Sequence, residues 1–187
     1  MVRETVLYLP VKEFLEARGY TVKSEVQDCD VVAVKDEEPV VVVELKLTFS
    51  MDLVLQGIQR QNITDDVYVA VRAPDTLAKH RNWRSRQRDY KKLCRRLGLG
   101  LMIVNPDTSR ERNVNVLVDP GPYVPRKSKR QKTRLMLEFA KRTGDPNTGG
   151  SNRTRIITAY RQDALRCAMA LNRQGSLKVV DIRAATG

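Results

Sequence analysis

The chain has few of the residues that build zinc sites, disulfides or histidine-based catalytic centres. Its 187 residues include three cysteines, Cys29, Cys94 and Cys167, which are scattered and show no paired metal-ligand spacing. Its single histidine, His80, argues against a histidine metal cluster and against a Ser-His-Asp triad. Because no structural disulfide is expected, we expect a protein of the reducing cytoplasm.

Long apolar segments are also missing. No apolar run approaches the roughly 18 residues of a membrane span, and the N-terminus lacks the apolar stretch of a signal peptide, so no membrane partner is expected. No Gly-x-x-x-x-Gly-Lys sequence is present, which argues against ATP-driven translocation by this chain alone. With 41% hydrophobic residues, the chain can bury one core and carry a small appendage.

Acidic residues are scarce after the first third of the chain. Residues 1–66 hold 7 Lys or Arg and 13 Asp or Glu, whereas residues 67–187 hold 27 and 9. Two basic blocks dominate the second part, residues 81–96 and residues 126–134. Each cation that neutralises a phosphate releases counterions, so these blocks predict binding to nucleic acid without sequence preference.

Candidate nucleic-acid contacts come from these two blocks. Trp83 and Tyr90 lie within the first block and could stack on exposed bases. The alternative is that the blocks form solvated helix faces and a loop, which Trp83 anchors to the core. The candidate residues are Arg81, Trp83, Arg84, Arg86, Arg88, Lys91, Lys92, Arg126, Lys127, Lys129 and Arg130.

Two short valine-rich segments predict an antiparallel β-hairpin. Residues 31–34 and 40–43 are β-branched runs, and residues 35–39 between them carry the charges and the proline that end strands. If Val34 pairs with Val40, each step back along the first strand matches a step forward along the second. Asp30 then lies opposite Glu44, with Cβ atoms about 4.5–5.5 Å apart on one face.

The open end of this hairpin predicts a metal site. Lys46 shares the face of Asp30 and Glu44 because strand side chains alternate, whereas Leu45 points into the core. Two opposed carboxylates cost stability unless something offsets their charge, and a hard divalent cation would do so. We therefore expect Asp30, Glu44 and the Leu45 backbone carbonyl to hold Mg²⁺ or Mn²⁺, with Lys46 positioning a water or stabilising charge on phosphorus.

That arrangement suits hydrolysis of a phosphodiester, because Mg²⁺ keeps several waters and leaves positions open for a phosphate and an attacking water. The alternative is a surface hairpin in which Glu44 and Lys46 make solvated ion pairs. Asp28, opposite Lys46 in the same register, would then be the partner of that lysine. A bare Glu-x-Lys is common in charged proteins, so the surrounding pattern has to decide.

The pattern Asp30-Val-Val-Ala-Val followed by Glu44-Leu-Lys46 resembles the PD-(D/E)XK nucleases, which share the restriction-endonuclease-like fold. Cys29 stands where the name of that motif has proline. The segments 4–20, 28–30 and 145–150 more closely resemble a bacterial family described as PD-(D/E)XK phosphodiesterases, over nearly the whole chain. The resemblance implies a metal-dependent nuclease and allows a homodimer, although no segment indicates a dimer interface.

Two further site residues are implied by the resemblance alone. Similar nucleases contribute a glutamate from the first helix, which corresponds to Glu4, while Glu13 and Glu16 are weaker candidates. They also place a glutamine on the helix after the lysine, which corresponds to Gln56 better than to Gln59. Glu4 could equally be an ordinary carboxylate near a helix N-terminus, and Gln56 a surface residue.

The remaining pattern predicts an α/β fold in the order α-β-β-β-α-β-α-β, with a mixed central sheet flanked by helices. We expect a helix before Gly19, a helix over 51–59, a strand over 67–71, a basic helix over 90–97 and a strand over 99–104. Gly57 inside a helix costs about 1 kcal/mol relative to alanine, which predicts close packing there.

The last third of the chain predicts a helical appendage. Proline and glycine punctuate residues 120–125 and 143–151, so we expect a nuclease-like core over 1–125, a basic helix and linker over 126–150, and an appendage over 151–187. We expect helices over 133–142, 155–172 and 179–186. The last two, with the short gap between them, resemble the start of a helix-turn-helix or winged-helix module without its recognition helix. The alternative is a helical tail packed on the core.

We therefore expect a metal-dependent phosphodiesterase that acts on nucleic acid, with DNA as substrate and endonucleolytic cleavage as the mode. An RNA-processing enzyme has the same composition and stays open as an alternative. The competing class is a nuclease fold without catalytic activity that binds nucleic acid or regulates another protein. The distance of Glu4 and Gln56 from Asp30 separates the two classes.

Overall fold

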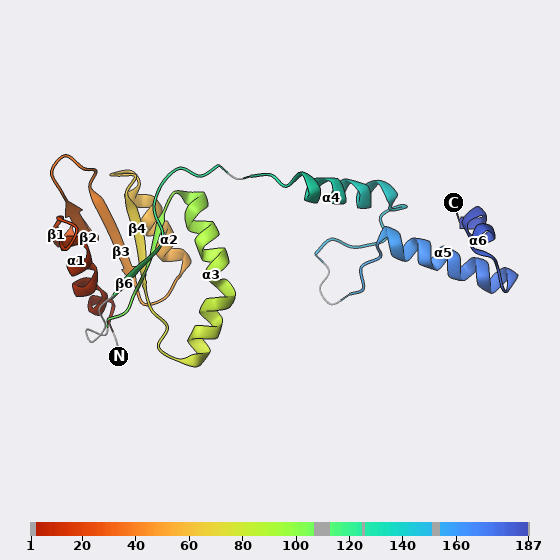
Figure 1. Cartoon of the computed structure of the whole chain (residues 1–187), viewed down its shortest axis with the longest axis horizontal. Coiled ribbons are helices and arrows are strands. Elements are labelled where there is room, and N and C mark those ends of the chain that lie inside the picture. Colours follow the sequence, from red (N-terminus) through yellow and green to blue (C-terminus); the bar gives the residue numbers. More distant parts are fainter. Residues whose placement is uncertain (1–2, 107–112, 125, 151–153, 187) are drawn as a thin grey trace. The chain divides into compact units, whose positions relative to one another are not determined.

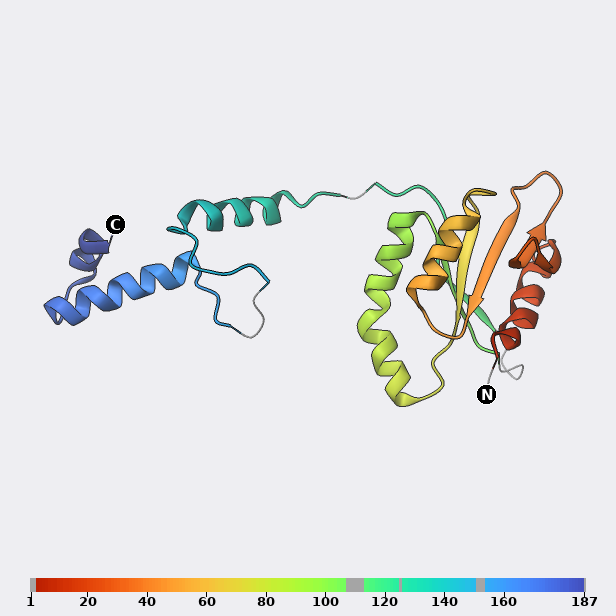
Figure 2. The ribbon, with the colours of Figure 1, turned by 180° about the vertical axis from the view of Figure 1, so that it is seen from behind.

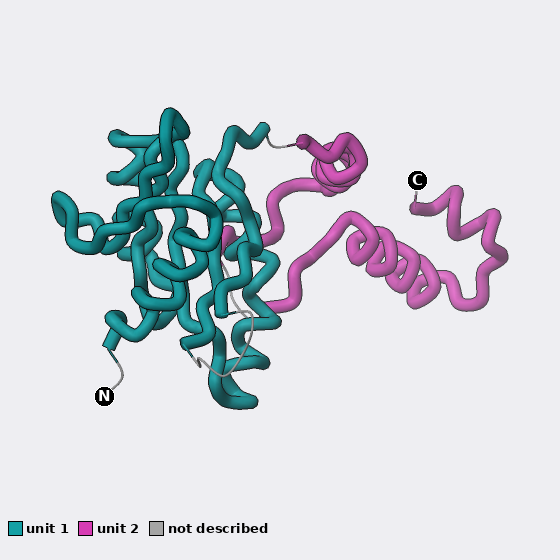
Figure 3. Tube along the Cα trace, turned by 60° about the vertical axis from the view of Figure 1, so that its left-hand side comes forward, with its two compact units in different colours: residues 1–125 teal, residues 126–187 magenta. Residues whose placement is uncertain are grey.

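The computed structural model describes residues 3–106, 113–124, 126–150 and 154–186. The chain divides into two compact units, residues 1–125 and residues 126–187, each of which is described by itself (Figure 3). Pro125 and Gly187, which bound the predicted core and the predicted appendage, lie outside the described residues. None of the helices in the described ranges has the length and apolar character that crossing a bilayer requires.

Six strands of the first unit form one mixed sheet in the order β1-β2-β3-β4-β5-β6. The strands are β1 (Thr21–Val26), β2 (Cys29–Val34), β3 (Val41–Lys46), β4 (Val67–Arg72), β5 (Gly100–Val104) and β6 (Val114–Val118). β1, β2 and β3 pair antiparallel, β3, β4 and β5 pair parallel, and β6 returns antiparallel to β5. The protein is of the α/β class, with the predicted element order and β6 in addition.

Helices cover both faces of the sheet (Figure 1). A short 3₁₀ turn, η1 (Glu4–Leu7), leads into α1 (Tyr8–Glu16) on one face, and α2 (Met51–Arg60) and α3 (Leu77–Leu97) lie on the other. One core cluster joins Leu7, Val11 and Leu15 to Val43 and neighbouring strand residues. A second joins residues of α2 and α3 to the other side of the same strands. Figure 2 shows both layers from behind.

Helix α2 packs closely on the sheet, as its glycine predicts. Ser50 caps the helix by accepting a hydrogen bond from the Leu53 backbone N–H at 3.2 Å. A Cβ at Gly57 would lie 3.0 Å from the Val69 side chain and 3.2 Å from that of Leu99. The helix therefore crosses directly over β4 beside β3, which positions its inward side chains above the hairpin.

Helix α3 is longer than the sequence pattern predicts. The expected helix over 90–97 begins instead at Leu77, so the whole first basic block is helical and the loop interpretation of residues 81–88 is wrong. Thr76 caps its start by accepting from the Lys79 N–H at 3.4 Å, and Gly98 ends it in the left-handed conformation at φ 72°. The inward face of the block consists of the buried Cys94 and the partly buried Trp83, Tyr90 and Leu93, and the first half of the block supplies only Trp83 to it.

The second unit contains three helices within its described residues: α4 (Lys129–Lys141), α5 (Ala159–Gln174) and α6 (Val179–Thr186). The Glu138 carboxylate links the first two, since it accepts from the Arg142 side chain at 2.8 Å and from the Ala159 N–H at 3.0 Å. A short turn joins α5 to α6, as in helix-turn-helix motifs. The assignment of this unit to such a module stays a prediction.

Candidate active site

The hairpin has the register that the valine runs predict. Val31 pairs with Val43, Val32 with Val42 and Ala33 with Val41, so one further step places Asp30 across from Glu44. The Asp30 carboxylate accepts a hydrogen bond from the Leu45 backbone N–H at 2.7 Å. The sheet itself therefore holds the two carboxylates side by side at the end of β2 and β3.

Glu44 is a buried carboxylate with a guanidinium as its partner. Its side chain is 1% exposed, and Arg60 Nε of α2 lies 2.6 Å from Glu44 Oε1. Burial raises the pKa of Glu44 most, the Arg60 hydrogen bond opposes this rise, and the Asp30 charge adds to it. A solvated surface hairpin does not fit these facts, because the Glu44 side chain is buried and the charge of Asp30 raises its pKa.

Lys46 is held at the site by Glu4. Lys46 Nζ lies 3.0 Å from Glu4 Oε2, which comes from η1. This hydrogen bond raises the pKa of Lys46, and the charges of Asp30 and Glu44 raise it further. Lys46 is therefore an ammonium at neutral pH, suited to an electrostatic role rather than to that of a general base. Asp28 contributes only its backbone carbonyl, which accepts from Arg60.

Gln56 faces the same region from α2. It precedes Arg60 by one helical turn, and the neighbouring Gly57 lies over Val69, the residue paired with Glu44 in the parallel ladder. Gln56 Oε1 is a buried oxygen for which the described part of the chain supplies no hydrogen-bond donor. Gln59, the other candidate, is exposed.

The weaker glutamate candidates lie elsewhere. Glu16 pairs with Lys12 one turn earlier in α1 at 3.7 Å, and Glu13 lines a separate depression between α1 and β6. Neither is brought to Asp30. Of the acidic residues in the first helical segment, Glu4 is the one that reaches the site, through Lys46.

The donor set fits a hard cation that keeps part of its water shell. Within the described ranges, no group of three or more His, Cys, Asp and Glu side chains could hold a metal ion. Mg²⁺ needs only one or two protein carboxylates, and Asp30, Glu44 and the Leu45 carbonyl supply oxygen ligands alone. The unpaired Gln56 oxygen adds a further polar group to the same helix face. A cation at Glu44 would compete with Arg60.

Most predicted nucleic-acid residues of the first block lie on the solvent side of α3. Arg81, Arg84, Arg86, Arg88 and Lys92 are exposed, and Lys91 is half-buried. Trp83 is also half-buried, packs against the core beneath α3 and lies 5.5 Å from the Tyr90 ring. Trp83 thus anchors a helix to the core, whereas the alternative interpretation gave it this role in a loop. Its role in stacking on bases stays a prediction.

The second basic block surrounds the start of α4. Arg126, Lys127, Lys129 and Arg130 are all exposed, and Ser128 caps the helix by accepting from the Gln131 N–H at 3.2 Å. Cations at a helix N-terminus face its positive dipole end, which is unfavourable without counter-charge. A polyanion would supply that counter-charge. The role of these four cations in nucleic-acid binding stays a prediction, which the charge at the helix N-terminus favours.

Comparison with protein families gives an independent result. Residues 102–187 match the model of the family described as "Putative PD-(D/E)XK phosphodiesterase (DUF2161)". The resemblance to the PD-(D/E)XK superfamily is confirmed. The matched residues begin in β5 and include the second unit, whereas the hairpin, Glu4 and Gln56 precede them. No curated protein matches the chain.

The match supports a nuclease or phosphodiesterase activity in general terms. Among the described residues, the six-stranded mixed sheet with helices on both faces is compatible with a restriction-endonuclease-like core. The superfamily acts on nucleic acid and in general uses divalent metals. Sequence reasoning missed one residue of the site, Arg60, although its position four residues after Gln56 on one helix face is the signal that could have indicated it.

Proposed function

We propose that this protein is a Mg²⁺- or Mn²⁺-dependent DNA endonuclease, with Asp30, Glu44 and Lys46 at its catalytic centre. The arrangement of the hairpin carries the proposal: Asp30 and Glu44 are neighbours across β2 and β3, and Lys46 follows on the same face with Glu4 as its partner. The basic face of α3, in the same unit as the acidic site, supplies the attraction that a phosphate backbone requires, and the start of α4 carries further exposed cations.

Each side chain has a separate task in this mechanism. Asp30 and Glu44 would hold the cation together with the Leu45 carbonyl, and the Leu45 N–H fixes the Asp30 carboxylate in place. Lys46 orients the attacking water or stabilises the negative charge that develops on phosphorus, while Glu4 positions its ammonium. A bound divalent cation supplies Lewis acidity toward the phosphate and a water of lowered pKa. Gln56 adds an oxygen acceptor near the water.

Plasmid nicking with Mg²⁺ tests the proposal. Asp30→Asn, Glu44→Gln and Lys46→Ala each remove a charge from the site and should lower the cleavage rate by about 100-fold or more. Glu37→Gln is the matched control, because Glu37 is an exposed carboxylate in the turn at the other end of the same hairpin. Cleavage by all three variants at the wild-type rate would remove the mechanism. DNA binding without metal should be retained by every variant.

One contact favours a second candidate function, a nuclease fold without activity that binds nucleic acid. Arg60 already neutralises Glu44, and a permanent ion pair there would leave no place for a cation. Arg60→Gln separates the two candidates, with Arg60→Lys as the control that keeps the charge. Removing a partner of a buried charge costs about 3 kcal/mol or more. For an enzyme, Mn²⁺ should raise the melting temperature of wild type, and that of Arg60→Gln still more. For an inactive fold, in which Arg60 keeps Glu44 paired, Mn²⁺ should leave the melting temperature of wild type unchanged.

We also propose that the protein works in the cytoplasm. All three cysteines are free thiols, two of them buried, and a reducing compartment keeps such thiols unpaired.

A further inference from the structure

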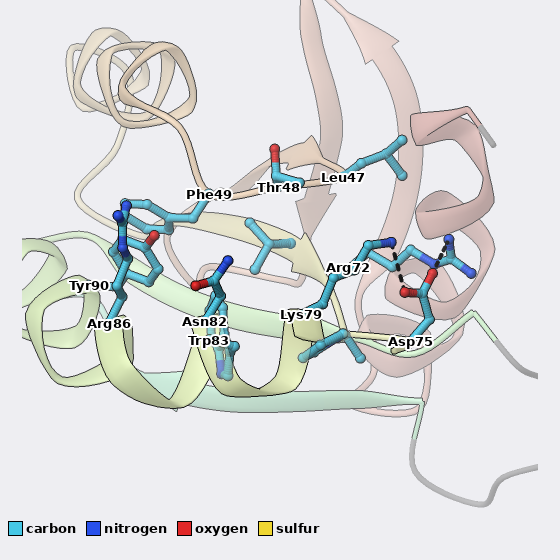
Figure 4. Close-up of a pocket in the computed structure, with 13 residues that line it drawn as sticks. Leu47, Thr48, Phe49, Arg72, Asp75, Lys79, Asn82, Trp83, Arg86 and Tyr90 are labelled. Atoms are coloured by element: carbon cyan, nitrogen blue, oxygen red, sulfur yellow. Dashed lines mark ion pairs between the residues drawn. The ribbon is translucent and has the colours of Figure 1, made fainter. Parts of the chain in front are cut away.

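A cavity of about 560 Å³ opens at the carboxyl ends of β3 and β4. Its walls come from residues 47–49, which directly follow Lys46, from residues 71–75, and from the part of α3 between residues 79 and 90 (Figure 4). This volume lies within the range of about 300–1,000 Å³ that small-molecule sites occupy. The cavity belongs to none of the residues assigned above to metal binding or hydrolysis.

Aromatic rings form one side of the cavity. Phe49 and Tyr90 are stacked, with centroids 4.0 Å apart and planes inclined by 20°. Trp83 lies 5.5 Å from Tyr90 at 45° and lines the same space. Figure 4 shows Phe49 and Tyr90 together at one side and Arg86 beside them. Aromatic faces of this kind can stack on any of the four nucleobases, since every nucleobase has a π-face.

Cations and an unsatisfied donor form the opposite side. Asp75 lies 2.7 Å from Lys79 Nζ and 3.4 Å from an Arg72 guanidinium nitrogen. Arg72 Nε is buried and finds no acceptor among the described residues, although Arg72 lines the cavity. With Arg86, the walls carry three cations and one carboxylate. A ligand with a planar ring and negative charge would satisfy both sides.

The cavity lies next to the carboxylates and on the same face of the sheet. Lys46 pairs with Val71, a wall residue, in the parallel ladder, and Glu44 pairs with Val69 two residues earlier. Val69 and Val71 both belong to the core cluster under α2 and α3, so Glu44 and Lys46 face that side as well. Neighbouring strands are about 4.8 Å apart, so one nucleotide could reach both places.

We propose that this cavity binds an unpaired nucleobase of the DNA substrate, next to the phosphodiester held at Asp30 and Glu44. The base stacks on the aromatic side formed by Phe49, Tyr90 and Trp83, and the cations of the opposite wall, Arg72 and Lys79, attract its phosphate. The inference rests on the proposed function, and it narrows the substrate to DNA with a nucleotide outside the double helix. Continuous duplex DNA offers no base for the cavity.

Binding without metal tests this, because it needs no catalysis. Two DNA duplexes are compared in EDTA, identical except that a single bulged nucleotide carries 2-aminopurine in one and is abasic in the other. The full-length protein should quench the 2-aminopurine fluorescence and bind this duplex about 5- to 150-fold more tightly than the abasic one. Equal affinity for the two duplexes by the wild-type protein overturns the proposal.

Variants then assign the preference to the cavity. Trp83→Leu and Arg72→Gln should each reduce the discrimination between the two duplexes, and Trp83→Phe should restore much of it. Arg95→Gln is the control, since Arg95 is an exposed cation of α3 outside the cavity. If Trp83→Leu does not fold, the Arg72→Gln variant and the affinities of wild type for the two duplexes still test the proposal. Discrimination unchanged in Arg72→Gln and in folded Trp83→Leu contradicts the assignment.

The same proteins and DNA duplexes distinguish failure of the base site from failure of the proposed nuclease function. Loss of cleavage in Glu44→Gln with equal binding of the two duplexes would leave the nuclease intact and remove the base site. Tight, base-dependent binding without any Mg²⁺-dependent cleavage by wild type would keep the base site and remove the nuclease.

Discussion

At the scale of single residues, Glu44 is the side chain on which burial, the Asp30 charge and the Arg60 guanidinium act in opposite directions. It is almost completely buried, faces Asp30 and is neutralised by Arg60, and burial is the largest influence on its pKa, which is raised. A buried carboxylate with a like charge beside it costs stability unless a cation offsets it. The Asp30–Glu44 pair therefore costs folding stability, and a perturbed pKa of this kind is typical of functional sites.

The pH dependence of stability follows from this raised pKa. The folded chain binds the Glu44 proton more tightly than the unfolded chain does, so the stabilising contribution is complete below the ordinary pKa of about 4.3. It is lost as the pH rises through the raised value. Glu44→Gln has no such proton, so wild type should lose stability relative to this variant as the pH rises from about 4.3 through the raised pKa of Glu44.

Urea unfolding in EDTA at several pH values measures this difference. Parallel stability curves for wild type and Glu44→Gln would show that burial does not raise the Glu44 pKa. Adding Mg²⁺ near neutral pH should offset the loss in wild type alone, because a bound cation stabilises the folded state by mass action.

At the scale of elements, α2 determines how the site is completed. Its Gly57 allows the helix to approach β4 closely, and this approach brings Arg60 into contact with Glu44. The Val69 and Leu99 side chains next to Gly57 are fully buried, so a methyl group at this position would force them to shift within a packed core. The position of the helix is therefore fixed by close packing rather than by its amphipathic pattern.

Gly57→Ala should destabilise the protein and reduce cleavage. The gain of about 1 kcal/mol in helix propensity is smaller than the cost of about 1–3 kcal/mol for forcing a methyl group into a packed core. A net loss of about 1 kcal/mol is expected in urea unfolding. Leu55→Ala is the control on the same helix, because Leu55 is 51% exposed and the change should stay within about 0.5 kcal/mol. A more stable Gly57→Ala variant would contradict the packing argument.

The elements also show what the sequence could predict. Runs of valine with a charged turn define both the strands and their register, so the opposition of Asp30 and Glu44 followed from local pattern alone. The first half of α3 did not, because residues 81–88 include one apolar residue and the helix depends on its caps at Thr76 and Gly98. β6 was missed although Val114, Val116 and Val118 alternate, since the run is short.

Local sequence patterns could not predict the contacts between distant segments of the chain. Glu4 reaches Lys46 from 42 residues away, and Arg60 reaches Glu44 from the far end of a helix. The resemblance indicated Glu4, whereas the position of Arg60 one helical turn after Gln56 was a signal that the sequence interpretation did not use. The cavity beside Lys46 likewise needs α3 in place, because Trp83 and Tyr90 lie about two turns apart on that helix.

At the scale of the whole molecule, charge is divided between an acidic site and basic surfaces. The exposed residues Arg84, Arg88 and Lys92 follow one another at helical spacing on α3. Each phosphate contact contributes about 0.9 to the slope of log affinity against log salt for duplex DNA. Changing all three to Gln should weaken DNA binding and lower this slope by up to about 3.

Fluorescence anisotropy across a salt series measures the slope. The matched control changes Lys12, Arg18 and Lys23 to Gln, which removes the same charge from α1, the turn after it and β1. A control with the same effect would assign binding to net charge instead of to the face of α3. An unaltered slope in the α3 variant would exclude this face from DNA binding.

The most direct measurement of the central claim is anomalous diffraction from a crystal soaked in Mn²⁺. The proposed mechanism predicts a manganese peak bound jointly by the Asp30 and Glu44 carboxylates, with Arg60 displaced from Glu44. A well-ordered hairpin without such a peak, and with Arg60 still bonded to Glu44, would contradict it.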